Sequence, residues 1–267
     1  MILGFISILL MGITLGLLGA GGSILTVPIL VYLFKINPVL STSYSLLLVG
    51  FTALIGAFLY FRKKQIDFSI AIKFAIPSII TVYLTRRFLL PAIPYEFAII
   101  GITIQKDLLI LLLFALIMFL TSIFMIKNSS KAQGQDNKMI LLNPHIKNIL
   151  IIIESSLVGV ITAIIGAGGG FLIVPALVLL NKANIKTAIG TSLLIIAAKS
   201  ILGFVGDVQA EVDIDYFLAI KLIVLASIGM FSGALLSKYL NPNNLKKSFG
   251  YFVMITSILI IIKEIIL

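Results

Sequence analysis

The chain has 267 residues, of which 60% are hydrophobic and 11% are charged, and its net charge is +10. Soluble domains are about 45–50% apolar and about 25% charged, so a core of this size cannot hide the apolar surface from water, and the composition predicts an integral membrane protein. The absence of cysteine and the single histidine exclude thiolate sites and a histidine cluster for zinc. We therefore expect no metal and no cofactor. The excess of positive charge is typical of basic cytoplasmic loops, so we expect no nucleic-acid partner.

Apolar runs between charged residues predict the helices. A membrane span needs about 20 residues, and the longer runs meet this length, the fourth if it continues to about Leu90. No basic stretch precedes the first run, so we expect it to be retained rather than cleaved as a signal peptide. Residues 88–104 carry two prolines and predict an irregular or interfacial segment. The runs, in chain order, are 1–17, 23–34, 39–61, 68–84, 107–127, 148–165, 170–180, 185–206, 216–237 and 247–266.

A polar stretch from Lys127 to Met139 divides the chain near its middle. It predicts a first transmembrane repeat at 1–127, a cytoplasmic linker at 128–147 and a second transmembrane repeat at 148–267. Shifting the chain by 147 residues overlays 19–56 on 166–203 without a gap, and about 16 of 38 positions are identical. Apolar composition would align leucine and valine by chance, but here glycine, proline, asparagine and serine also coincide. The sequence therefore contains an internal repeat.

The orientation of the two halves depends on how the first two runs of each half are counted. If each pair is a re-entrant hairpin that enters and leaves on one side, each half adds three crossings and the halves are inverted. The basic loop at 62–64 and the acidic loop at 207–215 then lie on opposite sides, which agrees with the positive-inside rule, with the N-terminus outside. Lys35 and the pair Arg86 and Arg87 are exceptions to that rule. If each pair is instead one kinked span, the halves are parallel, and we prefer the inverted reading.

Each repeat carries a glycine-rich break between apolar runs, GAGGS at 19–23 and GAGGG at 166–170. Neither matches a dinucleotide-binding or phosphate-loop pattern. One reading is close helix packing through small residues. The other is a broken helix whose free N–H groups and positive dipole end offer an anion site, as in secondary transporters. We favour the anion site, because the break recurs in both halves. The residues expected there are Gly21, Gly22, Ser23, Gly168, Gly169 and Gly170.

The helix after each break carries a polar stripe. Ser45, Thr52 and Gly56 in the first half match Ser192, Lys199 and Gly203 in the second, and each trio lies on one helical face. For the serines, interhelical hydrogen bonds are an equally good explanation. A lysine inside a span is costly, so Lys199 either snorkels to the surface or faces a cavity as a fixed cation.

The two motifs GAGG-SILTVP with STSYSL, and GAGGGFLIVP with GTSLLI, resemble the sulfite exporter TauE/SafE family over nearly the whole chain. The resemblance implies an inner-membrane carrier for sulfite, sulfonates or related organosulfur anions. The first half departs from the second at Ser43 and Tyr44, where the second has Gly190 and Thr191.

Together these features predict an all-α polytopic bundle of two inverted repeats with broken, re-entrant helices. Its expected function is secondary transport, as an exporter of a small anion across the cell inner membrane. Ser45, Thr191 and Ser192 would add hydroxyl donors to the breaks, and Lys199 the positive charge. No nucleophile with a base was found, so no enzyme is expected. Expected partners are the anion and the lipid bilayer, and a homo-oligomer is left open. The alternatives are a non-transporting membrane partner or anchoring subunit, and a channel.

Overall fold

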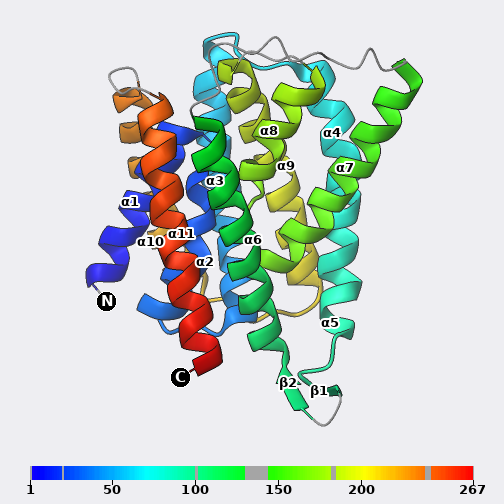
Figure 1. Cartoon of the computed structure of the whole chain (residues 1–267), viewed down its shortest axis with the longest axis vertical. Helices are drawn as coiled ribbons and strands as arrows, with labels where there is room; N and C mark the ends of the chain where they lie inside the picture. Colours follow the sequence, from blue (N-terminus) through cyan, green and yellow to red (C-terminus); the bar gives the residue numbers. More distant parts are fainter. Residues whose placement is uncertain are drawn as a thin grey trace.

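The structure, a computed structural model, describes residues 2–19, 21–99, 102–129, 144–181, 185–237 and 242–266. It is a bundle of helices that run roughly along one long axis (Figure 1). Within these residues, seven helices are long and apolar enough to cross a membrane, which confirms the predicted all-α membrane class. They are Pro38–Arg62, Phe68–Ala92, Lys106–Lys127, Asn148–Ile165, Lys186–Gln209, Tyr216–Leu236 and Lys247–Ile265.

The first half comprises the elements before the linker. The predicted linker itself, at 128–147, lies largely outside the described residues. In chain order the elements of this half are α1 (Ile2–Leu18), the 3₁₀ helix η1 (Gly21–Leu25), α2 (Thr26–Pro28), the π-helical turn η2 (Ile29–Leu33), α3 (Pro38–Arg62), α4 (Phe68–Leu84), the π-helical turn η3 (Thr85–Leu89), α5 (Leu90–Ala92), β1 (Glu96–Ile99), β2 (Ile102–Gln105) and α6 (Lys106–Ser129).

In the second half, every regular element among the described residues is a helix. The helices are α7 (Pro144–Ile165), α8 (Gly170–Asn181), α9 (Ile185–Gln209), α10 (Tyr216–Leu236) and α11 (Pro242–Ile266).

Polar caps fix where the long helices begin. The Asn37 side chain accepts a hydrogen bond from the N–H of Val39 at 2.9 Å at the start of α3, and Pro38 occupies the first turn. Asp67 caps α4 and Asp215 caps α10 in the same way. Such caps satisfy N–H groups that have no partner inside the helix, and proline is tolerated in the first turn. The register of these three helices is therefore set at their N-termini.

The first apolar pair of the chain is a hairpin. The ring of Phe5, near the start of α1, packs edge-on against the ring of Phe34 at 5.2 Å, and a Cβ at Gly4 would lie 2.6 Å from the same Phe34 ring. A single kinked span would place residues 5 and 34 at opposite ends of a helix about 45 Å long. The segment therefore returns to the level at which it began, with the glycine break at its turn.

The two halves exchange these hairpins. Helix α1 packs against α10, and its repeat equivalent α7 packs against α4, which is the equivalent of α10. The reciprocity extends to single residues: a Cβ at Gly19 would lie 2.3 Å from the Ile189 side chain, and one at Gly166 would lie 2.6 Å from Thr42. The two contacts are equivalent in the repeat, because Gly19 corresponds to Gly166 and Ile189 corresponds to Thr42 at the shift of 147 residues. The halves are thus interlocked.

The exposed surface of the bundle is apolar, as expected where lipid is the solvent. On α4 the exposed isoleucines recur every four residues, at Ile72, Ile76 and Ile80, and so form one outward stripe. The same pattern occurs on α10. The apolar residues in excess of what a core can hold therefore face outward.

The expectation for residues 88–104 was partly wrong. The helical path that begins with α4 continues through η3 and α5 to Ala92. Pro91 is the last residue but one of this path, so its missing N–H affects only the final turn. After it, β1 and β2 form an antiparallel hairpin with Glu96 opposite Gln105. Figure 1 shows this hairpin projecting from the lower end of the bundle.

Candidate functional site

The break in the second half is a tight glycine turn between two helices. Gly166, Gly168 and Gly169 have φ angles of 73°, 58° and 72°, in the left-handed region that residues with a Cβ rarely adopt. The N–H of Gly166 closes α7 by donating to Thr162 O at 2.9 Å. The first hydrogen bond of α8 runs from Leu172 to Gly169, so the N–H groups of residues 170 and 171 precede it. The second motif therefore ends one helix and begins another within five residues.

The break in the first half has the same letters but a different backbone. Gly19 has a φ of 76°, whereas Gly21 and Gly22 lie in the 3₁₀ helix η1 without a left-handed angle. Ser23 is also part of η1, and all three residues are buried. The sharp helix start expected at both breaks is therefore found only at Gly170, where α8 begins.

The two breaks lie next to each other in space, joined by hydroxyls of the first half. Ser23 Oγ donates to Ala167 O at 2.9 Å, and Ser45 Oγ donates to Gly166 O at 2.5 Å. Both serines are fully buried. The predicted residues Ser23 and Ser45 are thus brought to the second break, where they hold its carbonyl groups in place.

Lys199 is buried beside the second break. Its side chain is 1% exposed, and Nζ donates to Thr162 Oγ1 at 2.8 Å. A Cβ at Gly169 would lie 2.9 Å from this Nζ and 2.1 Å from the Thr162 side chain, so only glycine fits there. The snorkelling alternative is therefore wrong: the amino group lies inside the protein, against the break.

Thr191 and Ser192 follow Gly190 on α9 but do not reach the break with their hydroxyls. Thr191 Oγ1 accepts from the N–H of Asp67 at 3.0 Å, at the start of α4. Ser192 Oγ donates to Ile189 O of its own helix at 2.8 Å. Neither hydroxyl therefore contacts the break. The bond of Thr191 joins α9 to the start of α4, whereas that of Ser192 stays within α9 and is not the interhelical bond considered for the serines.

A second buried charged group was not recognised from the sequence. Arg86 of η3 is 0% exposed and pairs with Asp207 of α9, which is 1% exposed, at 3.3 Å. Arg86 Nη1 also donates to Thr42 Oγ1 at 2.9 Å. Because the Thr42 backbone packs against Gly166, this guanidinium is connected to the break from the side of α3. The one hint in the sequence was that Arg86 disagreed with the positive-inside rule.

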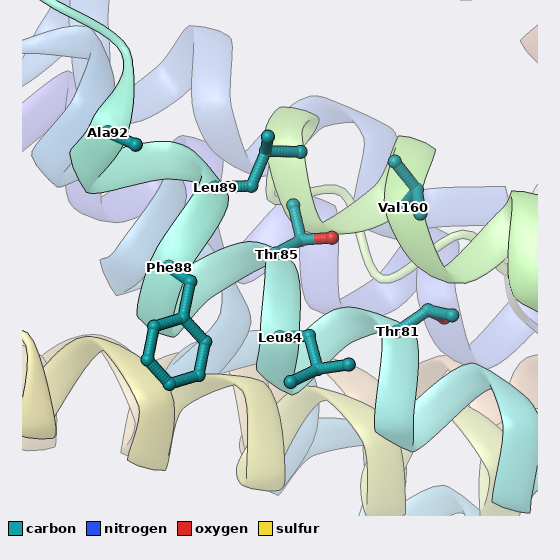
Figure 2. A pocket seen from close by; sticks show the side chains of 7 residues that line it. All are labelled: Thr81, Leu84, Thr85, Phe88, Leu89, Ala92 and Val160. Carbon is teal, nitrogen blue, oxygen red and sulfur yellow. The ribbon is translucent and has the colours of Figure 1, made fainter.

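A groove of about 480 Å³ opens between α4, η3 and α7, as Figure 2 shows. Leu84, Phe88 and Leu89 on its wall are exposed, so it faces outward toward lipid. Its hydroxyls include that of Thr81, which donates to carbonyl groups of its own helix. The groove contains none of the predicted site residues. Its lining residues are Thr81, Leu84, Thr85, Phe88, Leu89, Ala92 and Val160.

Several known proteins are similar to this chain along nearly its whole length. A "Probable membrane transporter protein" of Xylella fastidiosa (strain Temecula1) is 29% identical over 255 residues, covering 94% of this chain and 91% of its own length. Two Bacillus subtilis proteins are also described as "Probable membrane transporter protein". YdhB is 27% identical and covers 84% of this chain and 85% of its own length. YjnA is 26% identical and covers 96% of this chain and 97% of its own length. No solved structure matches.

The family described as "Sulfite exporter TauE/SafE" matches residues 4–260. This match spans both repeats and both glycine breaks, and it confirms the resemblance seen in the motifs. A buried lysine beside a broken helix, and relatives named as membrane transporters, fit the same assignment. The chain is a membrane transporter of the sulfite exporter TauE/SafE family.

Proposed function

We propose that the chain is a secondary transporter that exports a small anion, such as sulfite, a sulfonate or a related organosulfur anion, across the cell inner membrane. The observation that carries this proposal is the buried position of Lys199 beside the N-terminal end of α8. A helix N-terminus attracts anions through its free N–H groups and its dipole. A buried cation next to it adds to that attraction, because a charge inside the bundle is screened little.

The proposed binding residues form one set around the second break. Gly168 and Gly170 provide backbone N–H groups, and Lys199 provides the charge. The N–H of Gly169 donates to Ala167 O, so this residue instead provides the tight turn that lets Lys199 approach the break. Ser23 and Ser45 position the carbonyl groups of the break, so that these point away from the anion. Gly21, Gly22, Thr191 and Ser192 have supporting roles in packing, as their contacts suggest.

We infer that the two halves are inverted repeats that rock against each other in alternating access. The support is the hairpin of Phe5 and Phe34, the reciprocal contacts between equivalent positions, and the places where the halves begin. In Figure 1, α1 begins near the lower end of the bundle and α7 begins at the upper end. An interface of interlocked hairpins with buried hydroxyls lies where such a motion would pivot.

Flux through proteoliposomes tests the function. Wild-type protein should move radiolabelled sulfite in a saturable manner, and Lys199→Ala should reduce this flux at least ten-fold without changing the elution of the purified protein on size exclusion. Lys221→Ala is the matched control, because this lysine lies in the apolar helix α10 but is exposed. Equal flux in wild type and Lys199→Ala would remove the lysine from the site.

The substrate class is tested separately by thermal shift. Purified protein is heated with sulfite, thiosulfate, methanesulfonate or acetate. We expect the three sulfur oxyanions, but not acetate, to raise the melting temperature of wild-type protein and to leave that of Lys199→Ala unchanged. A wild-type protein that binds and moves none of these anions would favour a non-transporting membrane partner instead, and flux that does not saturate would favour a channel.

A further inference from the structure

Within the part of the chain that the structure describes, the Arg86 guanidinium makes hydrogen bonds and its ion pair through one of its three nitrogens. Nη1 donates to Thr42 Oγ1 at 2.9 Å and to Ser43 Oγ at 3.4 Å, and it also faces Asp207. Nε and Nη2 are buried, and among the residues that the structure describes neither has a hydrogen-bond partner. Buried donors without partners are rare because they are destabilising. Two of them on one side chain point to a ligand.

The two unused nitrogens have a specific geometry. In a guanidinium, the N–H of Nε and one N–H of Nη2 point the same way and form the edge that binds two oxygens of one acid group at once. Asp207 contacts Nη1 alone, so among the described residues this edge has no hydrogen-bond partner. The edge fits a carboxylate, a sulfonate or sulfite, in which two oxygens are attached to one atom, and it does not fit a spherical anion equally well.

The position of Arg86 connects it to the proposed anion site. Thr42 accepts its hydrogen bond and packs its backbone against Gly166, at the start of the break. Lys199 lies at the other end of the same break, against Gly169. Asp207, the ion-pair partner, follows Lys199 by eight residues on α9, which is about 12 Å along the helix axis. Two buried cations therefore flank one glycine turn.

We propose that Arg86 is a second oxyanion-binding residue of this site, taking two oxygens of the transported anion side-on with Nε and Nη2. The proposal rests on the proposed function and extends it: the substrate class is restricted to anions with two or more oxygens on one central atom. Lys199 supplies a point charge at one end of the break, and Arg86 recognises the shape of the acid group at the other end.

The test measures the KM for radiolabelled sulfite in proteoliposomes, together with the melting temperature without anion. Arg86→Lys keeps the charge but loses the two-nitrogen edge, so the KM should rise at least ten-fold. Arg87→Lys is the matched control, because Arg87 is adjacent and donates to the Gln209 carbonyl, and its KM should stay within two-fold of wild type. A KM for Arg86→Lys within two-fold of wild type overturns the proposal.

The variant Asp207→Asn distinguishes the role of the Nε and Nη2 edge of Arg86 from the role of its ion pair. It removes the carboxylate but retains Arg86, so the KM should be unchanged or lower. If Arg86 served only to hold η3 and α9 together, Asp207→Asn would lower the melting temperature and raise the KM as Arg86→Lys does. This outcome also overturns the proposal. The Asp207→Asn measurement still tests the proposal if the Arg86→Lys protein does not fold. If Lys199→Ala loses sulfite flux while Arg86→Lys keeps a normal KM, only the role of Arg86 is excluded. If the wild-type protein shows no flux, both proposals are excluded.

Discussion

Ser45 and Ser192 occupy equivalent positions of the two repeats, yet their hydroxyls act differently. Ser45 reaches across to the Gly166 carbonyl in the other half, and Ser192 bonds to the carbonyl of Ile189 in its own helix. The first hydroxyl satisfies an acceptor of a broken helix that has no helical partner, and the second shares a carbonyl inside a helix. Only the first therefore stabilises the site.

These two serines give a matched pair of substitutions. Ser45→Ala should reduce the free energy of unfolding by about 1–2 kcal/mol, because a buried carbonyl loses its donor. Ser192→Ala should change it by less than about 0.5 kcal/mol. Melting temperatures of the purified variants in the same detergent measure the difference. Equal melting temperatures would mean that the bond across the halves contributes nothing to stability.

At this scale the sequence singled out Lys199, because a lysine inside a long apolar run is conspicuous by itself. The structure buries it beside the second break, and its role in anion binding stays a prediction. The sequence did not identify the pair of Arg86 and Asp207, since the two residues are 121 positions apart and each lies close to the end of an apolar run. It also assigned Thr191 to the anion site, whereas its partner Asp67 is a loop residue whose position depends on tertiary structure. Pairs that form only through folding are not visible in a single sequence.

At the scale of elements, the two glycine breaks show that similar sequences can adopt different backbones. Gly168 has a φ of 58°, and a Cβ there would lie 2.6 Å from the side chain of Val49. Its equivalent, Gly21, lies in a 3₁₀ helix, and the nearest atom to a Cβ would be 3.6 Å away. The existence of both breaks followed from the sequence, but their difference depends on neighbouring helices.

Alanine at these equivalent positions should have different effects on stability. Gly168→Ala should destabilise the protein by about 2–4 kcal/mol, since it adds about 1–2 kcal/mol of left-handed strain to about 1–2 kcal/mol from the contact with Val49. Gly21→Ala should be tolerated. The yield of monodisperse protein and its melting temperature measure both. A Gly168→Ala protein as stable as wild type would show that the second break can open without cost.

The long helices were well predicted, because a run of about 20 apolar residues leaves few alternatives in lipid. The segment after α4 was not, since proline was read as a helix breaker. Pro91 stands one residue before the end of the helical path at Ala92, so its missing N–H interrupts only the final turn. Local propensity alone could not distinguish these positions.

At the scale of the whole molecule, α1 and α10 hold the halves together through glycines on both helices. A Cβ at Gly12 would lie 2.2 Å from the Ala226 carbonyl oxygen, and one at Gly16 would lie 2.3 Å from that of Met230. On α10, Gly229 and Gly233 approach the α1 backbone equally closely. Such small-residue stripes allow helix backbones to touch in lipid.

A larger residue should separate these two helices. Gly12→Ile should cost more than about 3 kcal/mol, because a backbone oxygen cannot move aside as a side chain can. Leu10→Ala on the same helix is the control, since Leu10 is 53% exposed and faces outward. Size exclusion should show aggregation for the first variant alone. A monodisperse Gly12→Ile protein would contradict the close crossing.

The inverted arrangement predicts the sides of two loops. Because the chain has no cysteine, a single introduced thiol reports on one position only. Lys63→Cys and Asp213→Cys both replace exposed residues, and an impermeant maleimide should label them from opposite sides of sealed vesicles. Labelling of both from the same side would instead support parallel repeats.

The exchange of hairpins between the halves also constrains how the chain folds during synthesis. Helix α1 is made first, but its packing partner α10 emerges roughly 200 residues later, so α1 must wait in the bilayer with its glycine stripe unpaired. Neither half contains the partner of its own hairpin, so neither half expressed alone can complete its packing. The two halves expressed together as separate chains contain every partner, and the fold could then assemble from two pieces.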